Sequence, residues 1–194
     1  PEPSPALLLE AFWASWHDRQ EVATIVFGKG EDASTIGHLA ERVLAAFLES
    51  DLARPVGAVI GIEEELRGQI VCDVPDLLAR IDLLVETDDE LTVVDFKTAR
   101  SRWSSSQAQG QAEQLLLYGE LARQLVPGKR LRLEYAVLTK TKSPSVERHV
   151  VLADSQQIRR TQRTIEQVWQ AIEAGYYCPT PSALNCPTCS FREP

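Results

Sequence analysis

Two aspartates stand where their side chains could hold a metal ion. Asp82 has apolar neighbours in RIDLLVE, and Asp95 follows the β-forming run TVV. An ionised carboxylate inside an apolar strand is costly unless a cation compensates it. If the two segments form a hairpin around residues 88–89, the carboxylates approach each other near its open end. A divalent metal ion is the natural way to hold them together.

Lys97 is expected beside this carboxylate pair. It follows Asp95 by two positions, so strand alternation places both side chains on one face of a sheet. Two carboxylates, a metal ion and an ammonium are the parts needed for phosphodiester hydrolysis. The metal activates a water and neutralises the phosphate, while the lysine orients the water or stabilises the developing charge. The alternative is structural: aspartates that cap strand ends and a lysine that snorkels to solvent.

The pattern resembles a known family. Asp82, twelve residues and then Asp95-Phe96-Lys97 is similar to the D…(D/E)xK signature of the PD-(D/E)xK nuclease superfamily, specifically its RecB-like branch, which includes CRISPR-adaptation nucleases. His38, after Gly37 at the start of an expected helix, resembles the histidine of the branch's G-x-x-H or G-H element.

A fourth motif follows the lysine in the family's order. The segment QLLLY, residues 114–118, resembles the Q-x-x-x-Y motif. Its i and i+4 spacing puts Gln114 and Tyr118 on one helical face, where the resemblance implies contacts to the DNA backbone and the active site.

The resemblance implies a divalent-metal-dependent DNase acting on single-stranded or resected ends, in recombination, repair, phage replication or CRISPR adaptation. It implies that His38, Asp82 and Asp95 hold Mg²⁺ or Mn²⁺, with the Phe96 carbonyl as a further ligand, and that Lys97 assists the attacking water. The partners implied are DNA and a helicase or recombination complex. A nuclease-fold module that binds DNA or a helicase without cutting is the alternative.

The sequence departs from the family pattern at two places. Ala79 replaces the glycine of G-x-x-D, a change between small residues. A glutamate often ends the preceding strand in the family, and three consecutive glutamates, residues 63–65, compete for that position. Glu64 is the residue we name.

Three cysteines close to the end of the sequence suggest a second metal site: Cys178, Cys186 and Cys189. The family resemblance implies a [4Fe-4S] cluster that pins the tail to the domain, whereas the same thiols also suit zinc, or no metal. Cys72 stands in an apolar run, QIVCDV, and is expected to pack in the core.

The fold expected is a mixed α/β (α+β) domain, with a restriction-endonuclease-like core in which helices flank a central mixed β-sheet. Short runs rich in Val and Ile predict an antiparallel meander between residues 56 and 98 and two strands near 131–154. Helices are expected before residue 48, over 106–125 and over 156–174. The domain expected over 1–194 comprises a helical lead-in (1–33), a catalytic core (34–175) and the cysteine-containing tail (176–194).

Two basic segments are candidate DNA contacts. Arg100, Arg102 and Trp103 follow the lysine strand, where an aromatic ring could stack on a base and arginines hold phosphates; an exposed loop is the alternative. Arg159, Arg160 and Arg163 lie on the polar side of the last expected helix and could follow a DNA backbone, unless they form an ordinary solvated face.

The distribution of charge fits a metal-centred site. Lys and Arg number 20 against 28 Asp and Glu, a net charge of −8, which by itself disfavours a nucleic acid partner. The acidity is concentrated, however: residues 61–95 hold 2 basic and 11 acidic side chains, and residues 97–194 hold 14 and 8. No apolar run suits a membrane span, and no signal peptide is recognised, so a cytoplasmic protein is expected.

Overall fold

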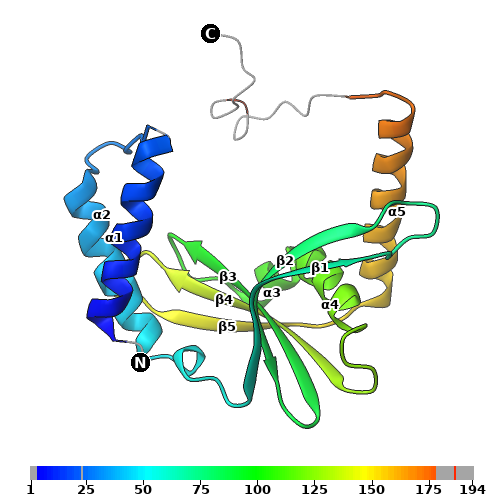
Figure 1. Ribbon diagram of the computed structural model, residues 1–194, viewed down its shortest axis with the longest axis horizontal. Helices are drawn as coiled ribbons and strands as arrows, with labels where there is room; N and C mark the ends of the chain where they lie inside the picture. Colours follow the sequence, from blue (N-terminus) through cyan, green and yellow to red (C-terminus); the bar gives the residue numbers. More distant parts are fainter. Residues whose placement is uncertain (1–3, 23, 178–185, 187–194) are drawn as a thin grey trace.

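A mixed sheet forms the centre of the computed structural model, which describes residues 4–22, 24–177 and 186. Its strands lie in sequence order, β1-β2-β3-β4-β5 (Figure 1). The pair β3 and β4 is parallel and the other neighbouring pairs are antiparallel. The mixed α/β fold expected from the sequence is therefore confirmed. The strands are β1 (Ala58–Gly68), β2 (Leu77–Glu86), β3 (Glu90–Ala99), β4 (Arg130–Thr139) and β5 (Val146–Val151).

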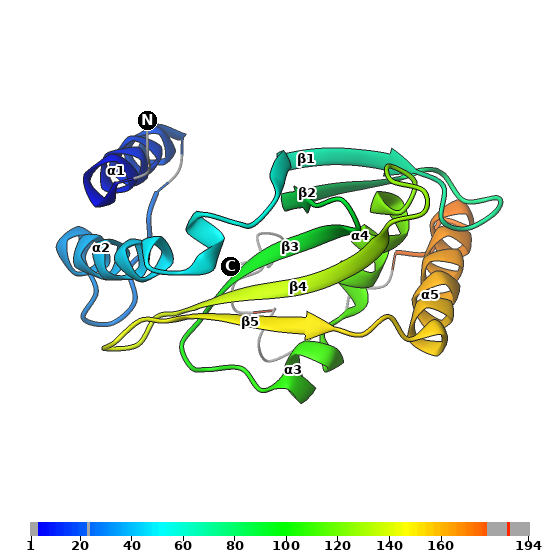
Figure 2. The ribbon, with the colours of Figure 1, turned by 90° about the horizontal axis from the view of Figure 1, so that it is seen from below.

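Helices lie at both ends of the sheet and over one of its faces. The pair α1 and α2 stands at one end and α5 at the other, in both views (Figures 1 and 2). None of the helices in the described part of the chain is both long and apolar enough to span a membrane. The helices are α1 (Pro5–Val22), α2 (Ala33–Leu48), α3 (Ser105–Gly110), α4 (Glu113–Ala122) and α5 (Ser155–Glu173), with a short 3₁₀ turn, η1 (Asp51–Ala53).

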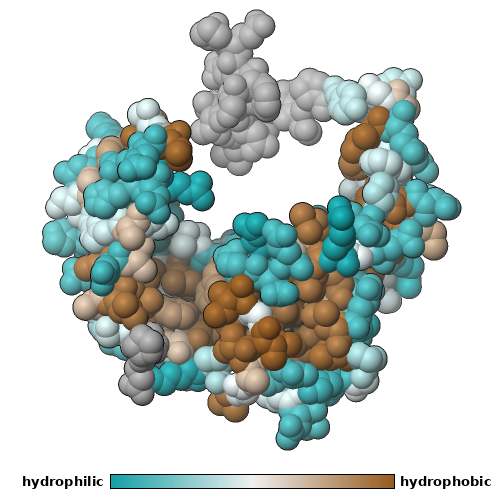
Figure 3. Space-filling model, viewed as in Figure 1, coloured by the Kyte–Doolittle hydropathy of each residue, from teal (hydrophilic) through white to brown (hydrophobic). Residues whose placement is uncertain are grey.

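The sheet separates two apolar clusters. The larger one joins the strands to α3 and α4, because Ala108, Leu115 and Leu116 are buried against Val93 and Tyr135. The smaller one lies on the opposite face, where the side chains that pack together are Leu52, Leu83, Val85, Val94, Ala136, Phe47, Phe96 and Val146. Figure 3 shows further apolar side chains gathered at the surface in the lower middle of the view, and exposed apolar residues of β1 include Val59, Ile60 and Ile62.

The alternation of β2 is interrupted at Asp82. Ile81 and Leu84 pack in the larger cluster, whereas Leu83 and Val85 pack in the smaller one. A regular strand would place Ile81 and Leu84 on opposite faces. The pairing of β2 with β3 also ends here, since its last pair is Leu83 with Val94. Asp82 therefore occupies the point where β2 leaves β3.

Three details differ from the sequence-based expectations. The run around Cys72 is a turn between β1 and β2 rather than a strand, and Cys72 is exposed, so its placement in the core was wrong. The helix expected over 106–125 is two helices, broken at Gln111 and Ala112. A short apolar run bounded by turn residues does not by itself distinguish a strand from a packed loop.

Candidate active site

Asp82 closes the open end of the β2–β3 hairpin with its side chain. Its Oδ2 accepts a hydrogen bond from the Phe96 main-chain N–H at 2.6 Å. Continuing the register beyond Leu83 and Val94 sets Asp82 opposite Asp95. The carboxylate thus takes the place that a strand carbonyl would occupy in a continued ladder, and the Asp82 charge lies close enough to Asp95 to act on it.

Asp95 is buried and in electrostatic contact with both other charged groups of the site. Its side chain is 3% exposed, and its Oδ2 lies 2.6 Å from Lys97 Nζ. Burial, the largest cause, raises the pKa of Asp95; Lys97 opposes this shift, and the Asp82 charge adds to it. The Oδ2 atom makes no aligned hydrogen bond within the described residues. A buried carboxylate oxygen of this kind is suited to a cation.

Lys97 begins a chain of hydrogen bonds that reaches α4. Its Nζ donates to Gln114 Oε1 at 3.0 Å, and Gln114 Nε2 donates to Tyr118 Oη at 2.6 Å. Gln114 and Tyr118 are one helical turn apart, so α4 presents both toward the lysine. The structure therefore brings Asp82, Asp95, Lys97, Gln114 and Tyr118 into one continuous group.

Tyr135 supports this group from the next strand, and the sequence reasoning missed it. Tyr135 pairs with Asp95 across β3 and β4, and Lys97 Nζ lies 5.7 Å from the centre of its ring. Its hydroxyl donates to the Gln111 carbonyl at 2.6 Å, at the break between α3 and α4. Burial, with the Asp95 charge second, raises the pKa of Tyr135 to about 12, so the hydroxyl remains a donor. A lone tyrosine in an apolar strand carries no signal of this role in the sequence.

His38 is not gathered with the aspartates. It is exposed on α2, with Nδ1 3.8 Å from Glu41. Within residues 4–22, 24–177 and 186, no three His, Cys, Asp or Glu side chains come together as a metal site. The neighbouring Gly37 has a packing role, because a Cβ there would come within 2.4 Å of the Trp13 ring on α1. The glycine of this motif thus lets α1 pack against α2.

The register assigns a different glutamate to the position opposite Asp82. Glu64 pairs with Ile81 and Ile62 pairs with Leu83, so Glu63 falls opposite Asp82. The register of β1 shifts by one residue between Val59 and Gly61, which the sequence does not reveal. Glu63 also has a positive φ of 51°, a conformation that is strained for a residue with a side chain.

The loop after β3 is held by packing and by charge. The Trp103 ring meets the Tyr135 ring edge-on at 5.5 Å between centroids, and it packs against the larger apolar cluster. Arg102 Nε lies 3.0 Å from Glu147 Oε1 on β5. Arg100 remains exposed. Trp103 therefore packs against the protein itself, whereas Arg100 and Arg102 are both exposed and Arg102 is ion-paired.

The cysteine prediction falls mostly outside the described structure. Cys178 and Cys189 lie outside the described residues, and Cys186 is half-buried. A cluster or zinc site formed by these thiols stays a prediction, which elemental analysis of the purified protein for iron and zinc tests.

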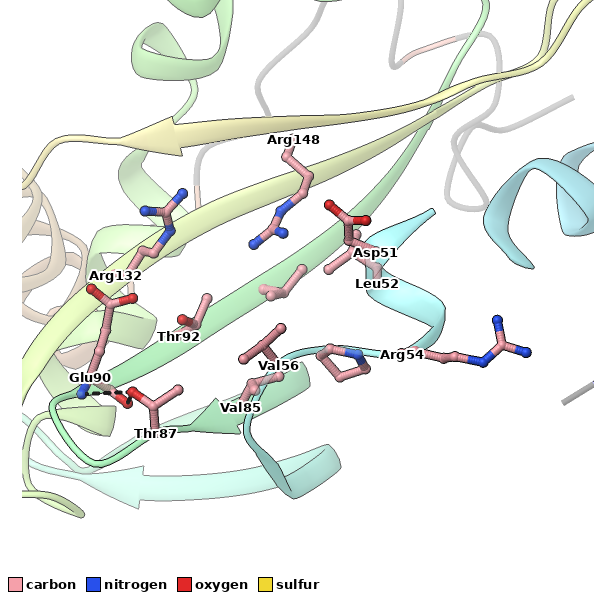
Figure 4. Close-up of a pocket in the computed structure, with 12 residues that line it drawn as sticks. Asp51, Leu52, Arg54, Val56, Val85, Thr87, Glu90, Thr92, Arg132 and Arg148 are labelled. Atoms are coloured by element: carbon pink, nitrogen blue, oxygen red, sulfur yellow. Dashed lines mark hydrogen bonds between the residues drawn. The ribbon is translucent and has the colours of Figure 1, made fainter. Parts of the chain in front are cut away.

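A pocket of about 400 Å³ lies on the other face of the sheet (Figure 4). It is lined by Val85 and Val94 of the smaller cluster and by Arg132 and Arg148. Both arginines donate hydrogen bonds to the fully buried carboxylate of Glu134. They neutralise a charge that would otherwise be costly in the interior. This pocket is separate from the aspartates, which open toward α4.

The sheet and its carboxylate-lysine group define a restriction-endonuclease-like class of fold. The model of the PD-(D/E)XK nuclease superfamily matches residues 2–193. The chain therefore belongs to this superfamily, which generally uses divalent metal ions.

A solved structure at low sequence identity shares the fold. The chain is similar to the crystal structure of a "Putative exonuclease" from Eubacterium rectale, with a TM-score of 0.59 and 16% identity over 99% of this chain and 74% of that chain. At this identity the likeness shows the fold alone. The structure of SSO0001 gives a TM-score of 0.40 and 18% identity over 70% of this chain and 67% of that chain, and carries no conclusion. No curated protein matches.

Proposed function

We propose that this chain is a divalent-metal-dependent deoxyribonuclease that acts as an exonuclease on single-stranded or resected DNA ends. The observation that carries the proposal is the juxtaposition of Asp82, Asp95 and Lys97 at the open end of the β2–β3 hairpin. Membership of the nuclease superfamily supports hydrolysis of a nucleic acid. Exonuclease rather than endonuclease action is proposed because the similar Eubacterium rectale protein is named as an exonuclease.

The residues present fit a hard divalent cation. Asp82 and Asp95 supply carboxylate oxygens, the Phe96 carbonyl adds a neutral oxygen, and these are the donors that Mg²⁺ and Mn²⁺ prefer. The raised pKa of Asp95 fits as well, because a cation would offset the burial and the repulsion between the two carboxylates. When bound, the ion supplies Lewis acidity at the phosphate and favours ionisation of a water.

The protein's own groups then have separate tasks. Lys97 Nζ is held between Asp95 and Gln114, so the ammonium is placed to orient the attacking water and to stabilise charge that develops on the phosphate. Gln114 and Tyr118 fix the lysine and present hydrogen-bonding groups along α4. We propose His38 as an additional ligand, which α2 would have to bring toward the aspartates.

Cleavage assays test the proposal directly. Labelled single- and double-stranded DNA is incubated with Mg²⁺, with Mn²⁺ or with a chelator, using wild-type protein, Lys97→Ala and the exposed loop variant Lys29→Ala as a matched control. We expect end-dependent cleavage with either metal, loss with the chelator or with Lys97→Ala, and normal cleavage by the control. Cleavage that survives chelation would overturn the proposal. Full cleavage by His38→Ala would confine the protein ligands to the two carboxylates and the Phe96 carbonyl.

The non-cleaving module is the other candidate, and the assay separates the two. Such a protein binds DNA in the chelator and in both metals but releases no labelled product. Residence in a helicase or recombination complex stays a prediction.

A further inference from the structure

Three arginines form an exposed basic surface on α5, here named the α5 patch: Arg159, Arg160 and Arg163. All three side chains are exposed, and with Gln156 they line one shallow pocket at the start of the helix. Helical spacing explains the cluster, since residues i, i+1 and i+4 fall on neighbouring parts of one helix surface. The opposite side of α5, with Ile158 and Thr161, packs toward the protein.

The α5 patch forms no ion pair within the described residues, although Glu166 lines a neighbouring pocket together with Arg159 and Arg163. Most basic side chains between residues 97 and 148 have a carboxylate within 4.0 Å: Lys97, Arg102, Arg123, Lys129, Arg130, Arg132 and Arg148. Across the described ranges, by contrast, no ion pair involves the α5 patch. In the part of the chain that the structure describes, the patch side chains make one hydrogen bond, from Arg159 Nη2 to Ser155 Oγ at 3.5 Å. In a chain of net charge −8, three clustered arginines, none of them ion-paired within the described residues, favour an anionic partner.

The start of α5 is fixed to the helix that follows the lysine strand. Gln109 of α3 and Gln157 of α5 exchange two hydrogen bonds of 3.2 Å, and Leu152 N donates to Gln109 Oε1 at 2.9 Å. Ile158 packs against the same cluster that contains Leu115 of α4. The start of α5 is therefore tied to α3 and to the cluster that α4 also contacts, and α5 stands at the end of the sheet away from α2 (Figure 2).

We propose that the α5 patch is an exosite that binds the sugar-phosphate backbone of the DNA substrate away from the bond that is cut. The proposal rests on the proposed function for the identity of the anion. Guanidinium groups suit phosphates because their donors match two oxygens at once, and such contacts anchor a strand without reading its sequence. The patch then raises the affinity for strands long enough to reach it and leaves the chemical step unchanged.

DNA binding is measured without metal ions, so that no cleavage can occur during the titration. A fluorescent single strand is titrated with protein in metal-free buffer, at several salt concentrations, and binding is followed by anisotropy. In the test variant the three patch arginines become alanine. In the matched control, three exposed basic residues elsewhere become alanine; these are Arg19, Lys29 and Arg54. A third variant replaces the patch arginines by lysine, which keeps the charge.

The salt dependence gives the expected result in numbers. Each phosphate contact on a single strand contributes about 0.7 to the slope of log K against log salt, so loss of the patch is expected to reduce the slope by about 2. The control variant is expected to keep the wild-type slope, and the lysine variant to recover most of it. Equal slopes for the wild-type and patch variants would overturn the exosite.

A cleavage comparison separates failure of the exosite from failure of the nuclease assignment. With metal, the patch variant is expected to cut a tetranucleotide at the wild-type rate and a much longer strand with a raised KM and an unchanged kcat. If no DNA is cut by any variant but the slope difference remains, the α5 patch stands as a DNA-binding surface and the nuclease proposal falls. If polyglutamate displaces the long strand from the patch as well as unlabelled DNA does, an acidic protein partner replaces DNA and the proposal is overturned.

Discussion

The Phe96 main-chain N–H donates a hydrogen bond to Asp82 Oδ2 across 2.6 Å, at the point where β2 stops pairing with β3. One side chain thus completes the backbone hydrogen bonding of β3 and also acts on Asp95 through its charge. The carboxylate has a structural task and a proposed metal-binding task at the same position. These two tasks respond differently to substitution.

Asp82→Ala is expected to destabilise the protein as well as abolish cleavage, whereas Asp82→Asn is expected to abolish cleavage and keep most of the stability. Alanine leaves the part-buried Phe96 N–H without a partner, at a cost of about 1–3 kcal/mol, while asparagine retains an oxygen acceptor. Urea unfolding in a chelator, alongside cleavage assays, measures both effects. Equal unfolding midpoints for the two variants would show that the hydrogen bond does not stabilise the hairpin end.

Asp95→Asn is expected to raise the thermal stability of the metal-free protein near neutral pH. Burial raises the pKa of Asp95 above its ordinary 3.8, so the folded state binds this proton more tightly than the unfolded chain does. The stability due to the protonated form is complete below pH 3.8 and is lost as the pH rises through the folded-state pKa. Asparagine cannot ionise, so the variant has no buried negative charge at this position. Lys97, whose side chain is 31% exposed, can turn its ammonium to solvent once the carboxylate is gone.

Melting curves of wild-type and Asp95→Asn protein in a chelator between mildly acid and neutral pH provide the measurement. The advantage of the variant is expected to grow with pH. Added Mg²⁺ is expected to stabilise the wild-type protein more than the variant, because only the wild type has both carboxylates. A variant that melts below the wild type at every pH would show that the Lys97 ion pair outweighs the burial cost of the carboxylate.

The sequence was sufficient for the parts of the site that lie on one element or one hairpin. Strand alternation relates Asp95 to Lys97, helical spacing relates Gln114 to Tyr118, and both depend only on local periodicity. Tyr135 could not be found this way, because its position beside Asp95 depends on the parallel pairing of β3 with β4, whose starts lie 40 residues apart. Pairing between distant segments leaves no local pattern in either one.

The register of β1 and the packing of the loop around Cys72 could not be predicted from the sequence either. In the register that follows the bulge in β1, Glu63 rather than Glu64 falls opposite Asp82, and a shift of one residue exchanges the faces of a strand. Cys72 lies among apolar residues in the sequence, and of these Val74 is buried and Ile70 packs against the larger cluster, yet Cys72 itself is exposed in the turn. Apolar composition alone does not determine which residue of such a short segment is buried.

Gln114→Ala is expected to lower kcat by more than tenfold with little change in KM for DNA. Gln114 accepts from Lys97 Nζ and donates to Tyr118, so its loss frees the lysine from one of its two polar partners. Misplacement of a catalytic group can cost on the order of a hundredfold in rate. Steady-state kinetics on a labelled strand give kcat and KM. The control is Gln124→Ala, in the exposed turn that follows α4. A rise in KM alone would make Gln114 a DNA contact rather than a positioning residue.

Tyr135 is expected to act as a positioning residue through two separable features, its ring and its hydroxyl. Tyr135→Phe keeps the ring beneath Lys97 and removes the donor to the Gln111 carbonyl, whereas Tyr135→Leu removes both. The phenylalanine variant is therefore expected to lose about 1–3 kcal/mol of stability, because the part-buried Gln111 carbonyl loses its hydrogen bond, and to keep kcat near the wild-type value. The leucine variant is expected to lose kcat as well, since the cation-π contact that holds the ammonium is gone. Urea unfolding and the pH profile of kcat distinguish these effects. If both variants lost stability to the same extent and kept the wild-type kcat and pH profile, Tyr135 would be a core residue without influence on Lys97.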